Sequence, residues 1–229
     1  MHVRQIGDLK LTFIVSGRLW RNALIMQDKE TGSFWDHVTG EALIGELKGK
    51  RLSGVPVVQT SWSEWVKAHP KTKVLKKEEE ITSSVYENYF KDPDRTGIFR
   101  TRWQMERLPG KRLIHGISLG PHALAVPDDK LKAGKLLQRR LGEEDILVLR
   151  ASDGGVRAFL AKVRDEALHF RPDSTGNQYL DEETGSVWDL EEGTCLSGRL
   201  KGERLKQLTV TAAFWFAWSS FYPNTEVVD

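Results

Sequence analysis

Two aspartates of this sequence have the type and spacing for acid–base chemistry. Asp36 and Asp189 each follow a tryptophan in the same short motif, 153 residues apart. Two carboxyl groups held close together have separated pKa values, so one can donate a proton while the other accepts one. His115 is the histidine that could assist them. The competing interpretation, which we prefer, is that each aspartate accepts hydrogen bonds within its own turn.

No other pattern typical of catalysis or of a metal site is present. The histidines include no pair four residues apart, and Cys195 is the only cysteine. There is no Gly-x-Ser-x-Gly elbow and no Walker-type phosphate loop. His115 and His122 could converge across the turn between them, but ordinary strand histidines account for both. Cys195 aligns with Ala42, a small residue, and is expected to be a buried structural thiol. We therefore predict no metal and no cofactor.

Three aromatic residues are the candidates for ligand binding: Tyr86, Tyr89 and Trp103. The two tyrosines lie in a long loop, which is either a lid over a site or a strap packed on the core. Trp103 lies in the arginine-rich stretch 95–112, a composition that can bind single-stranded nucleic acid. The formal net charge is only +2 and acidic residues lie nearby. We therefore expect a solvated connector and no nucleic-acid partner.

An internal repeat positions these residues. Residues 28–75 align with 181–228 without a gap, at a constant offset of 153. Six of the eight tryptophans form three pairs at this offset: Trp35 with Trp188, Trp62 with Trp215, and Trp65 with Trp218. The period is too long for a solenoid, so a half-domain or a domain has been duplicated.

Each copy has the pattern of a meander of short strands closed by one short helix, at 62–69 and 212–221. Strands at 145–150 and 156–162 form a hairpin around Ser152-Asp-Gly-Gly155. Asp128 or Asp129 is expected to cap a helix that extends to about Leu141. The predicted fold is α+β and β-rich, with two pseudo-symmetric halves. The predicted divisions are copy one at 1–75, a connector at 76–112, and copy two with its front section at 113–229.

The paired tryptophans are expected to anchor this architecture. Trp62, Trp65, Trp215 and Trp218 should pack the two helices on the sheets, because such rings bury large areas. Trp35 and Trp188 should occupy matching environments. These six side chains are therefore interpreted as duplicated core residues rather than as a binding surface.

Composition excludes several classes of protein. The chain has 229 residues, of which 39% are apolar, with 34 basic and 32 acidic side chains. These values exclude a disordered or collagenous chain, and one cysteine excludes an internal disulfide framework. No apolar run approaches the roughly 18 residues of a membrane-spanning helix. The charged, strand-like start at 1–8 is not a signal peptide, so a cytoplasmic location is expected for the sequence as written.

Several motifs resemble a bacterial family catalogued only as a domain of unknown function. The similarity covers nearly the whole chain, and its motifs are Glu30-Thr-Gly-Ser-Phe-Trp35, Thr39-Gly-Glu-Ala-Leu-Ile-Gly45, Trp62-Ser-Glu-Trp65, Pro70-Lys-Thr-Lys-Val-Leu75, Ala213-Phe-Trp-Phe-Ala-Trp218 and Phe221-Tyr-Pro-Asn-Thr-Glu226. The resemblance implies two tandem copies, often behind a signal or lipoprotein leader. It therefore implies an extracytoplasmic protein if Met1 is not the natural start.

The chain departs from this family at its beginning. Members usually carry a front half of copy one that ends in Cys-Pro-Leu-Cys, just before the strand that begins here at Met1. Copy two has Leu149-Arg-Ala-Ser152 in the corresponding neighbourhood. A redox or metal role of the cysteine pair is therefore not carried over, and the resemblance implies no activity.

The functional hypothesis is a non-enzymatic module that binds a small molecule or a protein in a cleft between the two copies. The alternative is a hydrolase or isomerase that uses Asp36 and Asp189. A third interpretation is a homodimer formed by strand addition at the open edge of copy one.

Overall fold

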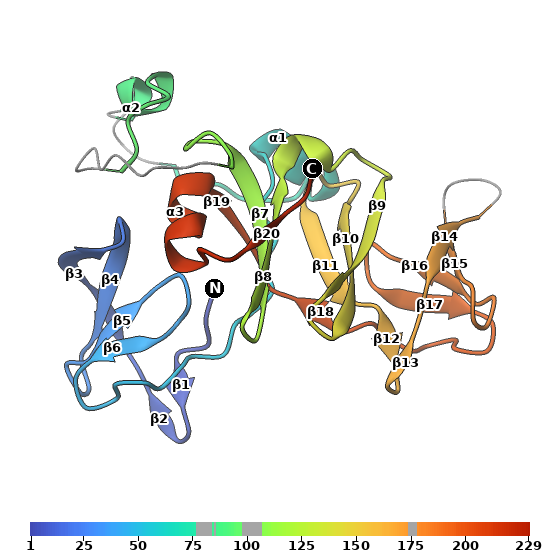
Figure 1. Cartoon of the computed structure of the whole chain (residues 1–229), viewed down its shortest axis with the longest axis horizontal. Coiled ribbons are helices and arrows are strands. Elements are labelled where there is room, and N and C mark those ends of the chain that lie inside the picture. The colour runs from blue at the N-terminus through green and yellow to red at the C-terminus, as the bar shows by residue number, and fades with distance from the viewer. Residues whose placement is uncertain (77–83, 85, 98–106, 174–177) are drawn as a thin grey trace. The chain divides into compact units, whose positions relative to one another are not determined.

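The structure is a computed structural model that describes residues 1–76, 84, 86–97, 107–173 and 178–229 (Figure 1). Strands predominate in these residues, which contain three α-helices and several antiparallel sheets. The prediction of a β-rich α+β fold is confirmed. The chain divides into two compact units: unit 1 is Met1–Val55, Lys77–Leu113 and Ala213–Asn224, and unit 2 is Pro56–Lys76, Ile114–Ala212 and Thr225–Asp229.

Unit 1 contains a four-stranded antiparallel sheet whose strands follow chain order. The turn between its first two strands places Arg21 and Asn22 at φ values of 51° and 60°, in the left-handed region that suits tight hairpins. One face packs on a small core around the fully buried Trp35. The strands are β3 (Phe13–Trp20), β4 (Ala23–Asp28), β5 (Phe34–Asp36) and β6 (Ala42–Ile44), preceded by the hairpin of β1 (Gln5–Ile6) and β2 (Leu9–Lys10).

Unit 2 contains a similar consecutive sheet around Trp188 and a second sheet of order β18-β11-β10-β9. The second sheet shares a core with the first, because Leu147, Leu149 and Phe159 pack in the cluster of Trp188. The first sheet is β14 (Phe170–Pro172), β15 (Tyr179–Asp181), β16 (Val187–Asp189) and β17 (Thr194–Ser197). The second is β9 (Leu136–Leu141), β10 (Glu144–Arg150), β11 (Val156–Leu160) and β18 (Gln207–Leu208), and a small hairpin joins β12 (Lys162–Val163) to β13 (Glu166–Ala167).

A further four-stranded sheet has the order β19-β7-β8-β20. Its last strand runs parallel to β8, whereas β7 and β8 form an antiparallel hairpin. The inner strands are almost entirely buried, and Ile117, Leu124 and Val126 contribute to the other core of unit 2. The strands are β7 (Leu113–Leu119), β8 (His122–Pro127), β19 (Val210–Phe214) and β20 (Glu226–Val227).

The prediction of a helix from Asp128 to about Leu141 is wrong. Only Asp128–Lys130 is helical, as a single 3₁₀ turn (η1), and Leu136–Leu141 is strand β9. Strand β9 pairs along its whole length with β10, for instance Leu137 with Val148. The ladder offered by β10 outweighs the local helix signal, which is the usual outcome when tertiary pairing and propensity disagree.

The α-helices are short: α1 (Trp62–Ala68) in unit 2, and α2 (Glu87–Lys91) and α3 (Trp215–Phe221) in unit 1. Helix α1 begins where the sequence predicts, because the Ser61 side chain accepts the backbone N–H of Glu64. Helix α3 begins three residues later than predicted, since Val210–Phe214 is strand β19. The helix after each tryptophan sheet thus belongs to the other compact unit.

Candidate functional site

The two predicted catalytic aspartates are each engaged in their own turn. Asp36 accepts the backbone N–H groups of Val38 at 2.8 Å and Thr39 at 3.0 Å, together with the Thr39 hydroxyl at 2.6 Å. Asp189 accepts the N–H groups of Glu191 at 2.9 Å and Glu192 at 3.2 Å. Asp36 lies in unit 1 and Asp189 in unit 2, so their pairing stays a prediction.

Sequence reasoning missed the aspartates that hold the repeat tryptophans. The indole N–H of Trp35 donates to Asp28 at 2.8 Å, and that of Trp188 donates to Asp181 at 2.9 Å. In each pair the aspartate precedes the tryptophan by seven positions, and this shared spacing was a signal available in the sequence. Burial opposes ionisation of Asp28, but the bonds from Trp35 and Thr31 outweigh it and keep the pKa of this carboxyl below its ordinary value.

His115 is the buried member of a partly exposed ion network in unit 2. Its Nε2 lies 2.7 Å from Oδ1 of Asp128, and the same oxygen accepts Nη2 of Arg150 at 2.5 Å. The imidazole is only 5% exposed, and burial lowers the pKa of His115 despite the opposing bond to Asp128. Arg150 also donates to the carbonyl oxygens of Leu131 and Gly154. This network ties η1 and the adjacent Leu131 to the β10–β11 turn, and it includes neither Asp36 nor Asp189.

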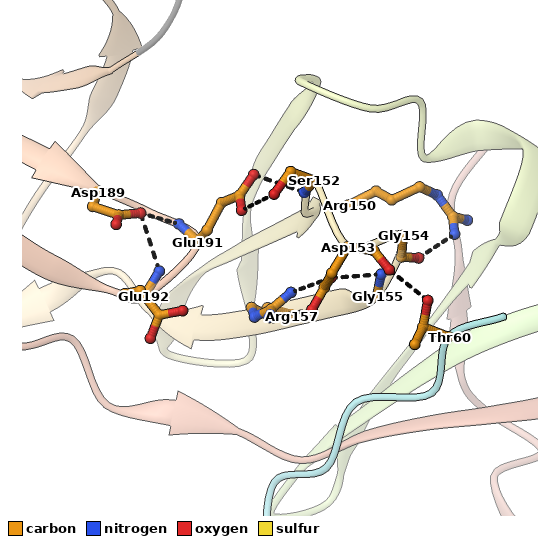
Figure 2. Close-up of polar contacts among 10 residues, drawn as sticks. All are labelled: Thr60, Arg150, Ser152, Asp153, Gly154, Gly155, Arg157, Asp189, Glu191 and Glu192. Atoms are coloured by element: carbon orange, nitrogen blue, oxygen red, sulfur yellow. Dashed lines mark hydrogen bonds and ion pairs between the residues drawn. The ribbon is translucent and has the colours of Figure 1, made fainter. Parts of the chain in front are cut away.

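The β10–β11 turn, Ala151–Gly155, is the centre of a dense polar cluster (Figure 2). Glu191 accepts both the N–H and the hydroxyl of Ser152 at 2.7 Å. Asp153 accepts two bonds from Arg157, at 2.9 and 2.7 Å. These bonds, against the effect of burial, lower the pKa of Asp153 to about 2. The turn is therefore held on both sides by charged side chains.

This turn holds the chain that leads into helix α1. The Thr60 hydroxyl donates to the Asp153 carbonyl at 2.5 Å (Figure 2). Val58 packs so closely on Gly155 that a Cβ there would lie 2.0 Å from Cγ1 of Val58. A Cβ on Gly154 would lie 3.2 Å from Cγ of Glu64. The cluster thus contacts both the chain that precedes α1 and Glu64 of the helix itself.

Helix α1 presents its tryptophans to solvent. Trp62 is 58% exposed and Trp65 is 38% exposed. The Trp65 indole donates to the Thr72 hydroxyl at 2.9 Å and its ring lies 4.1 Å from that of His69, so its orientation is fixed. The expectation that these two tryptophans anchor the helix to a sheet is wrong. The face of α1 that carries Trp62 and Trp65 is called the α1 face below.

Helix α3 buries the corresponding rings. Trp215 and Trp218 are each 2% exposed, as expected for anchors. A segment made of bends and a turn covers the helix: the N–H of Trp215 donates to the Arg112 carbonyl and the N–H of Phe216 to the Gly110 carbonyl, both at 2.9 Å. The guanidinium of Arg107 lies 5.2 Å from the Trp215 ring. Residues 107–112 are called the α3 cover below.

The predicted ligand-binding tyrosines lie on α2 and at its start. Tyr86 is 64% exposed, whereas the ring of Tyr89 lies beneath the ammonium group of Lys111 at 3.9 Å. Lys111 also donates to the carbonyl oxygens of Tyr89 and Asp92. Phe90 contacts Phe214, with ring centroids 6.2 Å apart. These contacts favour the strap over the lid. Trp103 lies outside the described residues.

Other kinds of site find no support in the part of the chain that the structure describes. No three histidine, cysteine, aspartate or glutamate side chains gather there in an arrangement that could hold a metal ion. Cys195 is buried, and burial raises the pKa of its thiol. Among the same residues no helix has the length and apolarity to cross a membrane.

The chain matches a known protein family. A family model described as "Protein of unknown function (DUF3179)" matches residues 2–225. No curated protein matches the chain.

Proposed function

The chain belongs to the DUF3179 family of unknown function, and for this member we propose a non-enzymatic role as a binding module whose binding surface is the α1 face. The observation that carries the proposal is the exposure of Trp62 and Trp65 on a helix that is firmly held. Exposed, rigidly oriented tryptophans are typical of binding hot spots, because they bury much area at little entropic cost.

The polar cluster supports this role by fixing the helix rather than by reacting. Asp153, Glu191 and Arg150 form hydrogen bonds that hold the β10–β11 turn, and this turn contacts Thr60 and Val58. Such a network preorganises a surface before its ligand arrives, which lowers the cost of binding. No observation favours catalysis by Asp36 and Asp189, since the carboxylate of each accepts N–H groups of its own turn. A cleft between the two copies stays a prediction.

The test is selection from a peptide display library on three immobilised proteins: wild type, Trp62→Ala/Trp65→Ala, and Trp20→Ala. Trp20 is a matched control, because it is a 39% exposed tryptophan of unit 1. We expect wild type and Trp20→Ala to enrich the same sequences and the double variant to enrich none of them. Enrichment that survives the double variant, or no enrichment by wild type, would contradict the proposal.

A second candidate partner is another copy of the chain, bound at the edge formed by Met1–Val3. Val3 donates to the Ser53 carbonyl and Val55 donates to the Met1 carbonyl, which satisfies one side of this edge. Among the described residues no strand lies on its other side, whereas β11 in unit 2 is flanked by both β18 and β10. Unpaired edges add strands from other chains. Light scattering of the wild-type protein tests this: a monomer at high concentration would exclude the dimer.

A further inference from the structure

The two helices that follow the tryptophan sheets correspond residue by residue. The ring centroids of Trp65 and His69 lie 4.1 Å apart with the planes tilted by 42°, and Trp218 stacks on Tyr222 at 4.2 Å. The backbone N–H that ends each helix donates to the carbonyl of the second tryptophan, from His69 to Trp65 and from Tyr222 to Trp218. Helix α3 therefore shows which kind of polymer fits on this face of the helix.

What fits there is a short polypeptide segment that makes a turn, in which the backbone N–H of Arg112 donates to the Pro109 carbonyl. The α3 cover supplies two backbone carbonyl groups to the first turn of α3 and lays one long charged side chain, that of Arg107, over Trp215. Arg107 also donates to the Pro223 carbonyl at 3.3 Å. The cover is basic, since three of its six residues are cations: Arg107, Lys111 and Arg112.

The charges around the α1 face are different. Position 67 is Lys where α3 has Ser220, and position 71 is Lys where α3 has Asn224. Lys73 and Lys76 follow, and all four lysines are exposed. Lys67 is paired with Glu64 at 2.8 Å, while no ion pair holds Lys71, Lys73 or Lys76 within the described ranges. A basic cover like that of α3 would be repelled here, and an acidic one attracted.

We propose that the ligand of the α1 face is an acidic polypeptide segment, seated on Trp62 and Trp65 and flanked by Lys71 and Lys73. This inference rests on the proposed function and adds the chemistry of its partner. Val74 and Leu75, which are 68% and 87% exposed, extend the apolar surface beside the lysines. The partner therefore combines acidic with apolar side chains.

The experiment measures the binding of two labelled peptides by fluorescence polarisation. One has the sequence of residues 107–113, and the other is the same peptide with R107E, K111E and R112E. We expect the acidic peptide to bind at least tenfold more tightly than the basic one, and its affinity to fall as salt is raised. Lys71→Glu/Lys73→Glu should weaken the acidic peptide at least tenfold, and Trp62→Ala should abolish its binding. A circular-dichroism melt checks that both variants are folded.

Three results would overturn the inference. One is equal or tighter binding of the basic peptide, and another is binding of the acidic peptide that the lysine variant leaves unchanged. The third is binding to phosphatidylserine vesicles without binding to the acidic peptide, which would assign the face to a lipid surface. If the peptide display library yields neutral or basic sequences whose binding depends on Trp62 and Trp65, the proposed binding function is supported and the acidic partner is excluded.

Discussion

Helices α1 and α3 have the same local structure and opposite exposure. Both span seven residues and end with the same capping bond, and both place an aromatic ring or imidazole on their second tryptophan. Yet Trp62 is 58% exposed and Trp215 only 2%. The difference follows from the segment outside the helix, because residues 107–112 cover α3 and no described segment covers α1 in this way. Similar local sequences therefore give an anchor in one unit and a free surface in the other.

The tryptophans of the two consecutive sheets, Trp35 and Trp188, differ from those of the helices because their exposure is the same in both units. Trp35 and Trp188 are both fully buried, and each meets a phenylalanine edge-on, Phe13 at 5.7 Å and Phe170 at 5.6 Å. Their indole groups bond to aspartates at the same spacing. The two environments match in these contacts, although Trp188 also packs against Leu147, Leu149 and Phe159 of the second sheet of unit 2.

The largest expected difference is between the first tryptophans of the two helices. Trp215→Ala should lower the free energy of unfolding by about 3–5 kcal/mol, because it leaves a cavity beneath the α3 cover. Trp62→Ala should change it by no more than about 0.5 kcal/mol, as is usual for exposed side chains. Urea unfolding of both variants measures this. Equal costs would show that α1 is as buried in solution as α3.

The next effect concerns the contact that holds α1 in place. Gly155→Ala should cost about 1–3 kcal/mol, because the new Cβ would meet Val58 at 2.0 Å. Gly155 has no left-handed φ, so crowding is the cause rather than strain. The double variant Gly155→Ala/Val58→Ala should recover most of the loss, and a cycle of the two substitutions measures the coupling. Additive effects would mean that Val58 is not the obstacle.

The tryptophan turns should respond alike. Asp28→Ala and Asp181→Ala should each cost about 1–3 kcal/mol, because each leaves a buried indole N–H without its acceptor. We expect the two costs to agree within about 0.5 kcal/mol in chemical denaturation. A clear inequality would show that the two turns differ in ways that their hydrogen bonds do not reveal.

The smallest effect is a pH dependence at the β10–β11 turn. Arg157 holds the pKa of Asp153 at about 2, below its ordinary value of 3.8. Because the folded-state pKa is lowered, the stabilisation is present above pH 3.8 and is lost as the pH falls towards 2. Between these values wild type should lose stability more steeply than Asp153→Asn. Thermal melts measure this, with Asp165→Asn as the exposed control; parallel curves would contradict it.

Much of the fold could be predicted from short-range patterns. The hairpin expected at 145–150 and 156–162 is β10 and β11, and the helix expected at 62–69 is α1. These elements carry their own signals, namely Asp-Gly-Gly at the turn and Ser61 at the cap. Strand β9 was not predicted, because its residues become a strand by pairing with β10 and not through a pattern of their own.

The candidate site was less predictable. The sequence pointed to Asp36, Asp189 and His115, and the structure shows each in a local or buried network. It treated Trp62 and Trp65 as core residues because apolar side chains at helical spacing are usually buried. The lysines beside them were available as a signal, since Lys67, Lys71 and Lys73 give this helix a solvated, charged setting that α3 lacks.

The sequence by itself determined the turns and the caps, because these depend on hydrogen bonds between residues two to seven positions apart. The pairs of Asp28 with Trp35 and of Ser61 with Glu64 are of this kind. Only the tertiary structure decided which tryptophans are exposed to solvent. Burial depends on segments distant in the chain, and residues 107–112 lie over Trp215 whereas Trp62 stays exposed. That non-local choice leaves the α1 face open for a partner.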